Sequence, residues 1–160
     1  MPLPGLELRP VGPDDRERVA SMFGRLSPDS RFMRFNSPKP GLTPRELAYL
    51  TDVDHFRHVA LAAVDRRDGS IVGTARYVEE AGRPGVADVA VEVVDELHNR
   101  GIGTALVAAV IERARENGFS LLTATTLWEN RPARALLRRL HFRVRGSRRG
   151  ELELELVLDR

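Results

Sequence analysis

The sequence of 160 residues predicts one domain of the α/β (α+β) class, with a mixed, mostly antiparallel sheet of six to seven strands and about four helices. Three observations predict it. Strand-like and helix-like segments are interleaved, and most neighbouring strands are joined by short turns, which favour antiparallel pairing. One strand–helix–strand unit, at residues 86–126, requires a parallel central strand pair. No repeat or long linker interrupts residues 1–160, so we expect a single domain.

Seven segments have the composition or the alternation of strands. Most are short apolar runs bounded by turn residues, and the last one alternates Leu with Glu, which predicts one buried and one wet face. The segment at 121–126 shows no clean alternation and is expected to be covered on both faces. The expected strands are Leu6–Val11, His58–Val64, Ile71–Val78, Val86–Val94, Leu121–Thr126, Phe142–Arg145 and Glu151–Leu158.

Four helices are predicted from apolar positions on one face and from capping residues at their starts. Asp14 and Glu17 are expected to form a capping box for the first helix, and Asn130 to cap the last. The segment Ser27–Phe35 is expected as a short helix or turn, and the proline-rich Asn36–Leu42 as a loop. The two remaining helices are expected to run from Thr43 to about Leu50 and over Ile102–Glu116.

Composition restricts the chemistry that the chain supports. It has no cysteine, which excludes disulfides, thiolate catalysis and cysteine-ligated metals. The formal net charge is only +2, which is not typical of a nucleic-acid-binding protein. The apolar runs are too short to cross a membrane and no signal peptide is recognisable, so we expect a cytoplasmic protein without a membrane partner. A homodimer is left open.

The most informative stretch is Val93–Leu106, where an apolar strand runs into two glycines and a helix begins at once. Backbone N–H groups without helical partners gather there, at the positive end of the helix dipole. Gly101 and Gly103 allow close approach to the backbone, which favours a phosphate or pyrophosphate ligand. A plain strand-to-helix turn explains the same residues equally well. Neither a Gly-Lys-Ser/Thr sequence nor a third glycine follows, so the stretch does not fit a P-loop or a dinucleotide fingerprint.

Two motifs resemble the GNAT superfamily of acyl-CoA-dependent N-acyltransferases. The first is His98-Asn99-Arg100-Gly101-Ile102-Gly103, with His98 in the usual Gln or Arg position. The second runs from Asn130 to Phe142, with Leu137 in place of the usual Tyr and His141 in place of the usual Gly. The resemblance implies a GNAT-like domain that uses acetyl-CoA as cosubstrate, without a metal.

The resemblance also implies which residues contact acetyl-CoA. In the family, backbone amides of the glycine loop hold the pyrophosphate, and the residue matching Asn130 contacts the pantetheine arm. On the preceding strand, one backbone N–H stabilises the oxyanion and another position pairs with the pantetheine amides. The residues implied are Val91, Val93, Asn99, Arg100, Gly101, Ile102, Gly103, Thr104, Asn130 and Ala133.

An amine acceptor needs a base, because a lysine-type ammonium is almost fully protonated at pH 7. Asp88 and Glu92 are the two carboxylates of the otherwise apolar strand VADVAVEVV, and they share a face if the strand is regular. Asp88 also matches the place where related lysine acetyltransferases often carry a Glu base. We expect Asp88 to be the catalytic base, with Glu92 as the second candidate; both could instead be wet-face residues of an ordinary strand.

The acceptor is predicted to be a protein lysine or a small-molecule amine. Leu26–Pro40, Thr43–Asp54 and Arg57–Asp65 resemble the acetyltransferase module of bacterial Pat-type protein-lysine acetyltransferases. Leu137 cannot protonate a leaving thiolate, which keeps open a catalytically silent acetyl-CoA-binding module. His55 and His58, near two aspartates, could bind a metal, but solvated residues before a strand are the favoured interpretation.

The last alternative is a nucleic-acid-binding domain, which is the least favoured. It rests on a basic group near the C-terminus that only one aromatic residue, Phe142, accompanies, so a stacking platform is not expected. The arginines of this group are Arg143, Arg145, Arg148 and Arg149.

Overall fold

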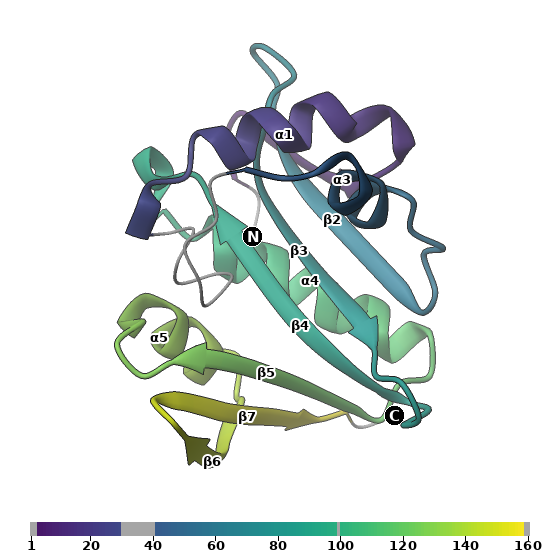
Figure 1. Ribbon diagram of the computed structural model, residues 1–160, viewed down its shortest axis with the longest axis vertical. Coiled ribbons are helices and arrows are strands. Elements are labelled where there is room, and N and C mark those ends of the chain that lie inside the picture. The colour runs from purple at the N-terminus through teal and green to yellow at the C-terminus, as the bar shows by residue number, and fades with distance from the viewer. Residues whose placement is uncertain (1–2, 30–40, 99, 159–160) are drawn as a thin grey trace.

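The computed structural model describes residues 3–29, 41–98 and 100–158. Its strands form one seven-stranded sheet in the order β1-β2-β3-β4-β5-β7-β6 (Figure 1). Only the β4–β5 neighbours in this sheet are parallel, which confirms the predicted mixed sheet with a parallel central pair. The strands are β1 (Leu6–Pro10), β2 (His58–Asp65), β3 (Ile71–Glu79), β4 (Val86–Val93), β5 (Leu121–Leu127), β6 (Arg143–Arg148) and β7 (Glu151–Val157).

The described part of the chain holds four α-helices, as predicted, and two short 3-10 helices. Figure 1 shows α1 and α3 on one face of the sheet and α4 on the other, with α5 after β5. Two layers of helices therefore enclose the central strands. The helices are η1 (Pro13–Asp15), α1 (Arg16–Gly24), α3 (Pro44–Thr51), η2 (Asp95–Leu97), α4 (Ile102–Glu116) and α5 (Arg131–Arg139).

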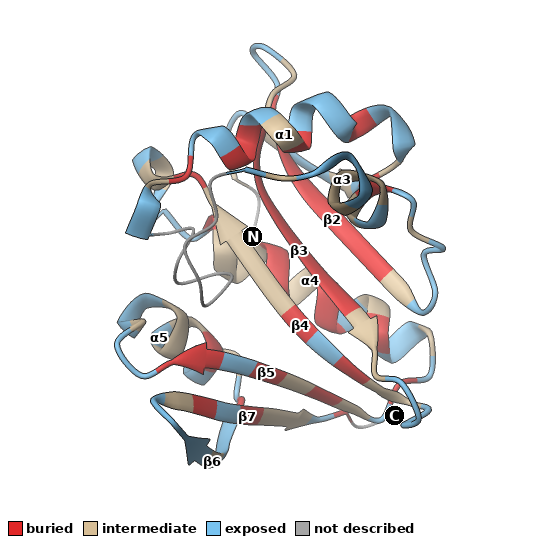
Figure 2. Cartoon of the chain, in the orientation of Figure 1, coloured by how far each residue is buried: buried red, intermediate tan, exposed pale blue. Residues whose placement is uncertain are grey.

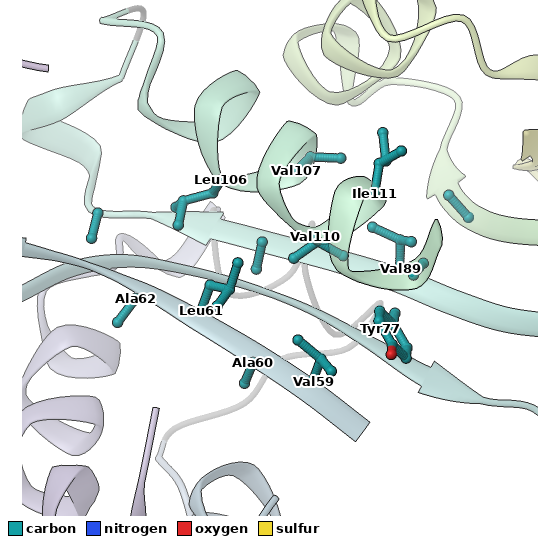
Figure 3. Packing of buried hydrophobic residues seen from close by; sticks show 14 of the residues in the cluster. Val59, Ala60, Leu61, Ala62, Tyr77, Val89, Leu106, Val107, Val110 and Ile111 are labelled. Carbon is teal, nitrogen blue, oxygen red and sulfur yellow. The ribbon is translucent and has the colours of Figure 1, made fainter. Parts of the chain in front are cut away.

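The core lies between α4 and strands β2 to β4 (Figure 3). Leu106, Val107 and Val110 of α4 are fully buried, and Leu106 and Val110 lie one turn apart on the apolar face that the sequence predicted. Strands β2 and β3 are buried along most of their length (Figure 2). These buried strands support β4, which pairs with β3.

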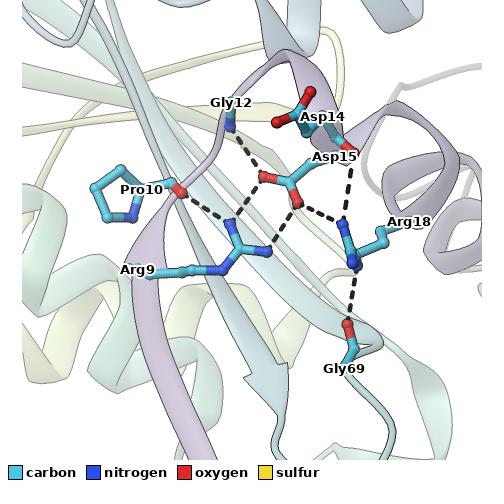
Figure 4. A network of polar contacts seen from close by, with 7 residues as sticks. All are labelled: Arg9, Pro10, Gly12, Asp14, Asp15, Arg18 and Gly69. Atoms are coloured by element: carbon cyan, nitrogen blue, oxygen red, sulfur yellow. Dashed lines mark hydrogen bonds and ion pairs between the residues drawn. The ribbon is translucent and has the colours of Figure 1, made fainter.

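The predicted cap of the first helix is wrong. Asp15, not Asp14, closes this turn: its carboxylate accepts the Gly12 N–H at 2.9 Å and a bidentate pair of Arg9 N–H bonds at 2.8 Å (Figure 4). Asp15 is buried, whereas Asp14 is exposed. The 3-10 turn Pro13–Asp15 shifts the start of the helix by one residue, which the capping-box pattern with Glu17 does not reveal.

The expectation that β5 is covered on both faces is also wrong. Leu122 and Ala124 are buried, but the opposite face carries Thr123, which is half-buried, and Thr125, which is exposed. The reason is that none of the described helices covers the Thr face of this half of the sheet (Figure 1). The predicted strand Phe142–Arg145 begins one residue later and extends to Arg148.

Other expectations from the sequence fall partly or wholly outside the described residues. Most of Ser27–Phe35 and most of Asn36–Leu42 lie there, as does Asn99. Among the residues that the structure does describe, no helix combines the length and apolar character needed to span a bilayer.

Candidate active site

Strands β4 and β5 pair only at their beginnings. Their register runs from Val86–Leu121 to Asp88–Thr123 and then ends, although both strands continue. Figure 1 shows the two strands spreading apart toward their C-terminal ends. We call this feature the β4–β5 fork: residues 89–93 of β4 and 124–127 of β5. Within the described residues, one edge of β4 therefore has no neighbouring strand over residues 89–93.

The backbone of β4 directs alternate peptide groups into this fork. Val94 N–H donates to the Val72 carbonyl at 2.9 Å, and β3 and β4 keep an unbroken antiparallel register. Alternation then turns the N–H and C=O groups of Val89, Val91 and Val93 away from β3 and toward the fork. Val91 is the position predicted to donate its N–H to the oxyanion, and Val93 is the position predicted to pair with the pantetheine amides.

One of these backbone groups already has a partner. The Val93 carbonyl lies 2.7 Å from Nε2 of His98, and because a carbonyl only accepts, that ring nitrogen carries the hydrogen. A carbonyl oxygen has two lone pairs, so Val93 retains capacity for a second donor. The side chain of His98, at the beginning of the glycine loop, is thus hydrogen-bonded to the end of β4.

The N-terminus of α4 presents three backbone donors beside the fork. Gly101 precedes the helix with φ +81°, a left-handed conformation that favours glycine. The first helical bond runs from Ala105 N–H to the Gly101 carbonyl, so the N–H groups of Ile102, Gly103 and Thr104 have no partner within the helix. A Cβ on Gly103 would lie 2.9 Å from Leu136 of α5, so this glycine also permits helix packing. Arg100, predicted with this loop, is exposed.

Asn130 caps α5, as predicted from the sequence. Its Oδ1 accepts a hydrogen bond from the Ala133 N–H at 3.2 Å. Ala133 is the other residue predicted from this motif, and its backbone N–H is thus engaged in the cap. Within the described residues the Asn130 side-chain amide donates no hydrogen bond, so both of its N–H groups remain for another acceptor. Leu137, at the position where a Tyr is usual in the family, is buried in the core at 5% exposure.

The two candidate bases lie on the same face of β4, because its pairing with β3 has no bulge. Asp88 is exposed, and its Oδ1 accepts a hydrogen bond from the Thr123 hydroxyl at 2.9 Å. Glu92 is half-buried and accepts a 2.5 Å bond from the Thr74 hydroxyl. The two carboxylates therefore have different hydrogen-bond partners. Asp88 lies where the fork begins, and Glu92 lies near its open end.

Asp88, but not Glu92, lines a cavity of about 320 Å³ on the α3 side of the sheet. Ala90 of β4 lines the cavity from the sheet, and Tyr49 and Leu50 line it from α3. Since Ala90 belongs to the part of β4 that borders the fork, the cavity opens beside the free strand edge. The lining residues are Tyr49, Leu50, Arg76, Val78, Glu79, Glu80, Asp88 and Ala90.

The inner wall of this cavity contains an arginine that the sequence analysis did not identify. Arg76 is 3% exposed, and its Nη1 donates to the Leu50 carbonyl at 3.1 Å and lies 3.0 Å from Nε2 of His58. Burial, followed by the positive charge of Arg76, lowers the pKa of His58 to about 4. The sequence signal for Arg76 is its position as a charged residue within the apolar run IVGTARYV.

The metal hypothesis for His55 and His58 is not supported by these contacts. His58 is bonded to Arg76, and Asp54 accepts three backbone N–H bonds, including that of His58. No group of three or more His, Cys, Asp or Glu that could bind a metal occurs in residues 3–29, 41–98 and 100–158. Asp54 and His55 belong to the turn that leads into β2, which begins at His58.

The sequence matches a family model and is similar to known proteins over most of its length. Residues 27–142 match the family model described as Acetyltransferase (GNAT) family. An acetyltransferase of Pseudomonas aeruginosa is 32% identical over 137 residues, which cover 84% of this chain and 73% of that protein. Acetyltransferase Pat of Mycolicibacterium smegmatis is 33% identical over 133 residues, 83% of this chain; the chain spans only 40% of the length of that relative.

A solved structure matches over nearly the whole chain. The GNAT domain of the PAT protein of S. lividans superposes with a TM-score of 0.89 at 28% identity, covering 96% of this chain and 90% of that one. The similarity therefore extends over nearly the whole fold.

Proposed function

The chain belongs to the acetyltransferase (GNAT) family, and we propose that it transfers an acetyl group from acetyl-CoA to an amine by direct attack in a ternary complex. The observation that carries the proposal is the β4–β5 fork, where the backbone groups of Val89, Val91 and Val93 face away from β3 and the donors of α4 lie beside them. About 16 Å separate Val93 from Asp88 along an extended strand, a span suited to an extended pantetheine chain.

The residues fit this cosubstrate in three respects. The N–H groups of Ile102, Gly103 and Thr104 would hold the pyrophosphate, because helix N-termini favour anions. The free edge of β4 would align the pantetheine arm, with the Val91 N–H as the oxyanion donor. Asn130 has amide hydrogens to donate to the arm.

The acceptor amine would occupy the cavity beside the fork. Asp88 would take the proton that the ammonium must lose, directly or through water, before the nitrogen attacks the thioester carbon. The carbon–sulfur bond then breaks, and the second proton of the attacking nitrogen passes to water. Leu137 has no proton to give, but a thiol pKa of about 8.5 allows the thiolate to leave unprotonated near neutral pH.

We propose a lysine side chain of a protein as the favoured acceptor, with small amines second. Three carboxylates, Glu79, Glu80 and Asp88, outnumber the cationic Arg76 in the cavity lining and favour a cationic amine over an anionic acceptor. The 33% identity to Acetyltransferase Pat and the 0.89 TM-score to the PAT domain support the same choice.

The test is release of free thiol from acetyl-CoA in the presence of lysine-containing proteins and small amines. Because the chain has no cysteine, a thiol reagent reports only the released coenzyme when the acceptor proteins also lack cysteine. We expect acceptor-dependent release together with a higher melting temperature in acetyl-CoA, since a ligand that binds the folded state stabilises it. A melting shift without release from any acceptor would instead indicate a catalytically silent acetyl-CoA-binding module.

A further inference from the structure

Thr123 occupies the last paired position before β4 and β5 separate. It lies opposite Asp88 in the parallel register, and its hydroxyl is 2.9 Å from the Asp88 carboxylate. The same hydroxyl is 2.9 Å from Oε1 of Glu80 and 3.5 Å from the Ala87 carbonyl. One hydroxyl group therefore connects two carboxylates that both line the cavity.

The surroundings hold this hydroxyl in place. Thr123 is β-branched and lies within a strand, so its side chain has few available rotamers. Its neighbours Leu122 and Ala124 are buried on the opposite face, which fixes the strand. Glu80 is held in turn by Arg83, whose Nη1 lies 2.8 Å from the second Glu80 oxygen.

A hydroxyl has one hydrogen to donate and lone pairs with which to accept. When Asp88 is ionised, Thr123 can donate its hydrogen to Asp88. When Asp88 has taken the proton of the acceptor amine, the new carboxyl O–H can donate to the Thr123 oxygen, and Thr123 can turn its own hydrogen to Glu80. No proton leaves the group in this exchange, so the arrangement fits both protonation states of the base.

Resting on the proposed function, we propose that Thr123 is a positioning residue, which orients Asp88 toward the acceptor amine before and after proton transfer. Thr123 itself would contact neither substrate. Its removal should therefore affect the catalytic step and leave acetyl-CoA binding unchanged.

The experiment compares Thr123→Val, Thr123→Ser and the control Ser147→Ala. Valine keeps the shape and the strand preference of threonine but has no hydroxyl, whereas serine restores it. Ser147 lies in β6, outside the fork and the cavity, is exposed, and its hydroxyl makes no hydrogen bond within the described part of the chain. For each protein, kcat and KM for a lysine-containing acceptor are measured, with the acetyl-CoA dissociation constant obtained by calorimetry.

We expect Thr123→Val to lower kcat about tenfold or more, since it removes a hydrogen bond to a charged group. Its acetyl-CoA dissociation constant should stay within about twofold, Thr123→Ser should recover most of kcat, and Ser147→Ala should match the wild type. An unchanged kcat in Thr123→Val, or a loss that serine does not restore, would overturn the proposal. So would weaker acetyl-CoA binding, which indicates a structural role. If the wild type transfers no acetyl group, the proposed function itself fails, which this comparison distinguishes from a failure of Thr123 alone.

Discussion

Nη1 of Arg76 lies 3.0 Å from Nε2 of His58 in the wall of the cavity beside Asp88. Since a guanidinium can only donate, Nε2 is the acceptor and the hydrogen of the neutral ring is on Nδ1. The same Nη1 holds the Leu50 carbonyl in the last turn of α3. This contact joins β2, β3 and the helix that covers the cavity.

The first prediction follows from this neutral histidine. Burial and Arg76 lower the pKa of His58 from 6.5 to about 4, so the folded state disfavours the proton that the unfolded chain binds. Folding stability contributed by His58 is therefore complete above pH 6.5 and is lost as the pH falls toward 4. Urea unfolding measures the free energy of unfolding at pH 7 and at pH 5. The decrease between the two pH values should be smaller for His58→Gln than for the wild type. Equal losses would contradict a neutral, buried His58.

The second prediction concerns Asp15 and the correction at the first helix. Asp15→Ala leaves Arg9 and the Gly12 N–H without their partner and should destabilise the protein by about 2–3 kcal/mol at pH 7. The hydrogen bond from Arg9 lowers the pKa of Asp15, so this contribution is present above about pH 4 and disappears as the pH falls further. The control is Asp14→Ala, which should change stability by less than about 0.5 kcal/mol. A larger effect at Asp14 would restore the cap predicted from the sequence.

The third prediction concerns the turn before α4. At Gly101, φ is +81°, which costs an alanine roughly 1–2 kcal/mol, although no atom lies within 4 Å of the added Cβ. Gly101→Ala should lower folding stability by that amount and weaken acetyl-CoA binding, because the donors of Ile102 to Thr104 shift with the turn. Gly146→Ala is the matched control, since Gly146 has open space and no positive φ. Calorimetric titration and thermal melting measure both effects; unchanged binding in Gly101→Ala would argue against a ligand at this helix end.

The fourth prediction separates the two candidate bases. Asp88→Asn keeps the size of the side chain but cannot accept the amine proton, so turnover should fall by about 10² to 10⁴. Acetyl-CoA affinity should be unchanged, because Asp88 lies in the acceptor cavity and not at the helix end. Glu92→Gln should retain most activity, since Glu92 does not line that cavity. The opposite pattern of turnover would assign the base to Glu92.

The sequence predicted those parts of the structure that depend on local patterns. Apolar periodicity and short turns predicted the order of strands and helices, and the strand–helix–strand unit predicted the parallel β4–β5 pair. Asn130 as a cap was also predictable, because capping involves residues only three positions apart.

Contacts between distant segments were not predictable from a single sequence. Thr123 lies 35 positions from Asp88, and Arg76 lies 18 positions from His58, so no local pattern connects either pair. The end of the β4–β5 pairing after Asp88 and Thr123 leaves no signal in either strand. The cap at Asp15 was missed because Asp14 and Asp15 are equally plausible caps until the turn at Pro13 is known.

The central claim is that the β4–β5 fork and the N-terminus of α4 bind acetyl-CoA. Its most direct test is a crystal structure of the chain grown with coenzyme A. We predict a diphosphate within about 3 Å of the N–H groups of Ile102, Gly103 and Thr104, with the pantetheine arm along Val91 and Val93. A fork that stays empty at saturating coenzyme, or that the protein's own side chains fill, would contradict the claim.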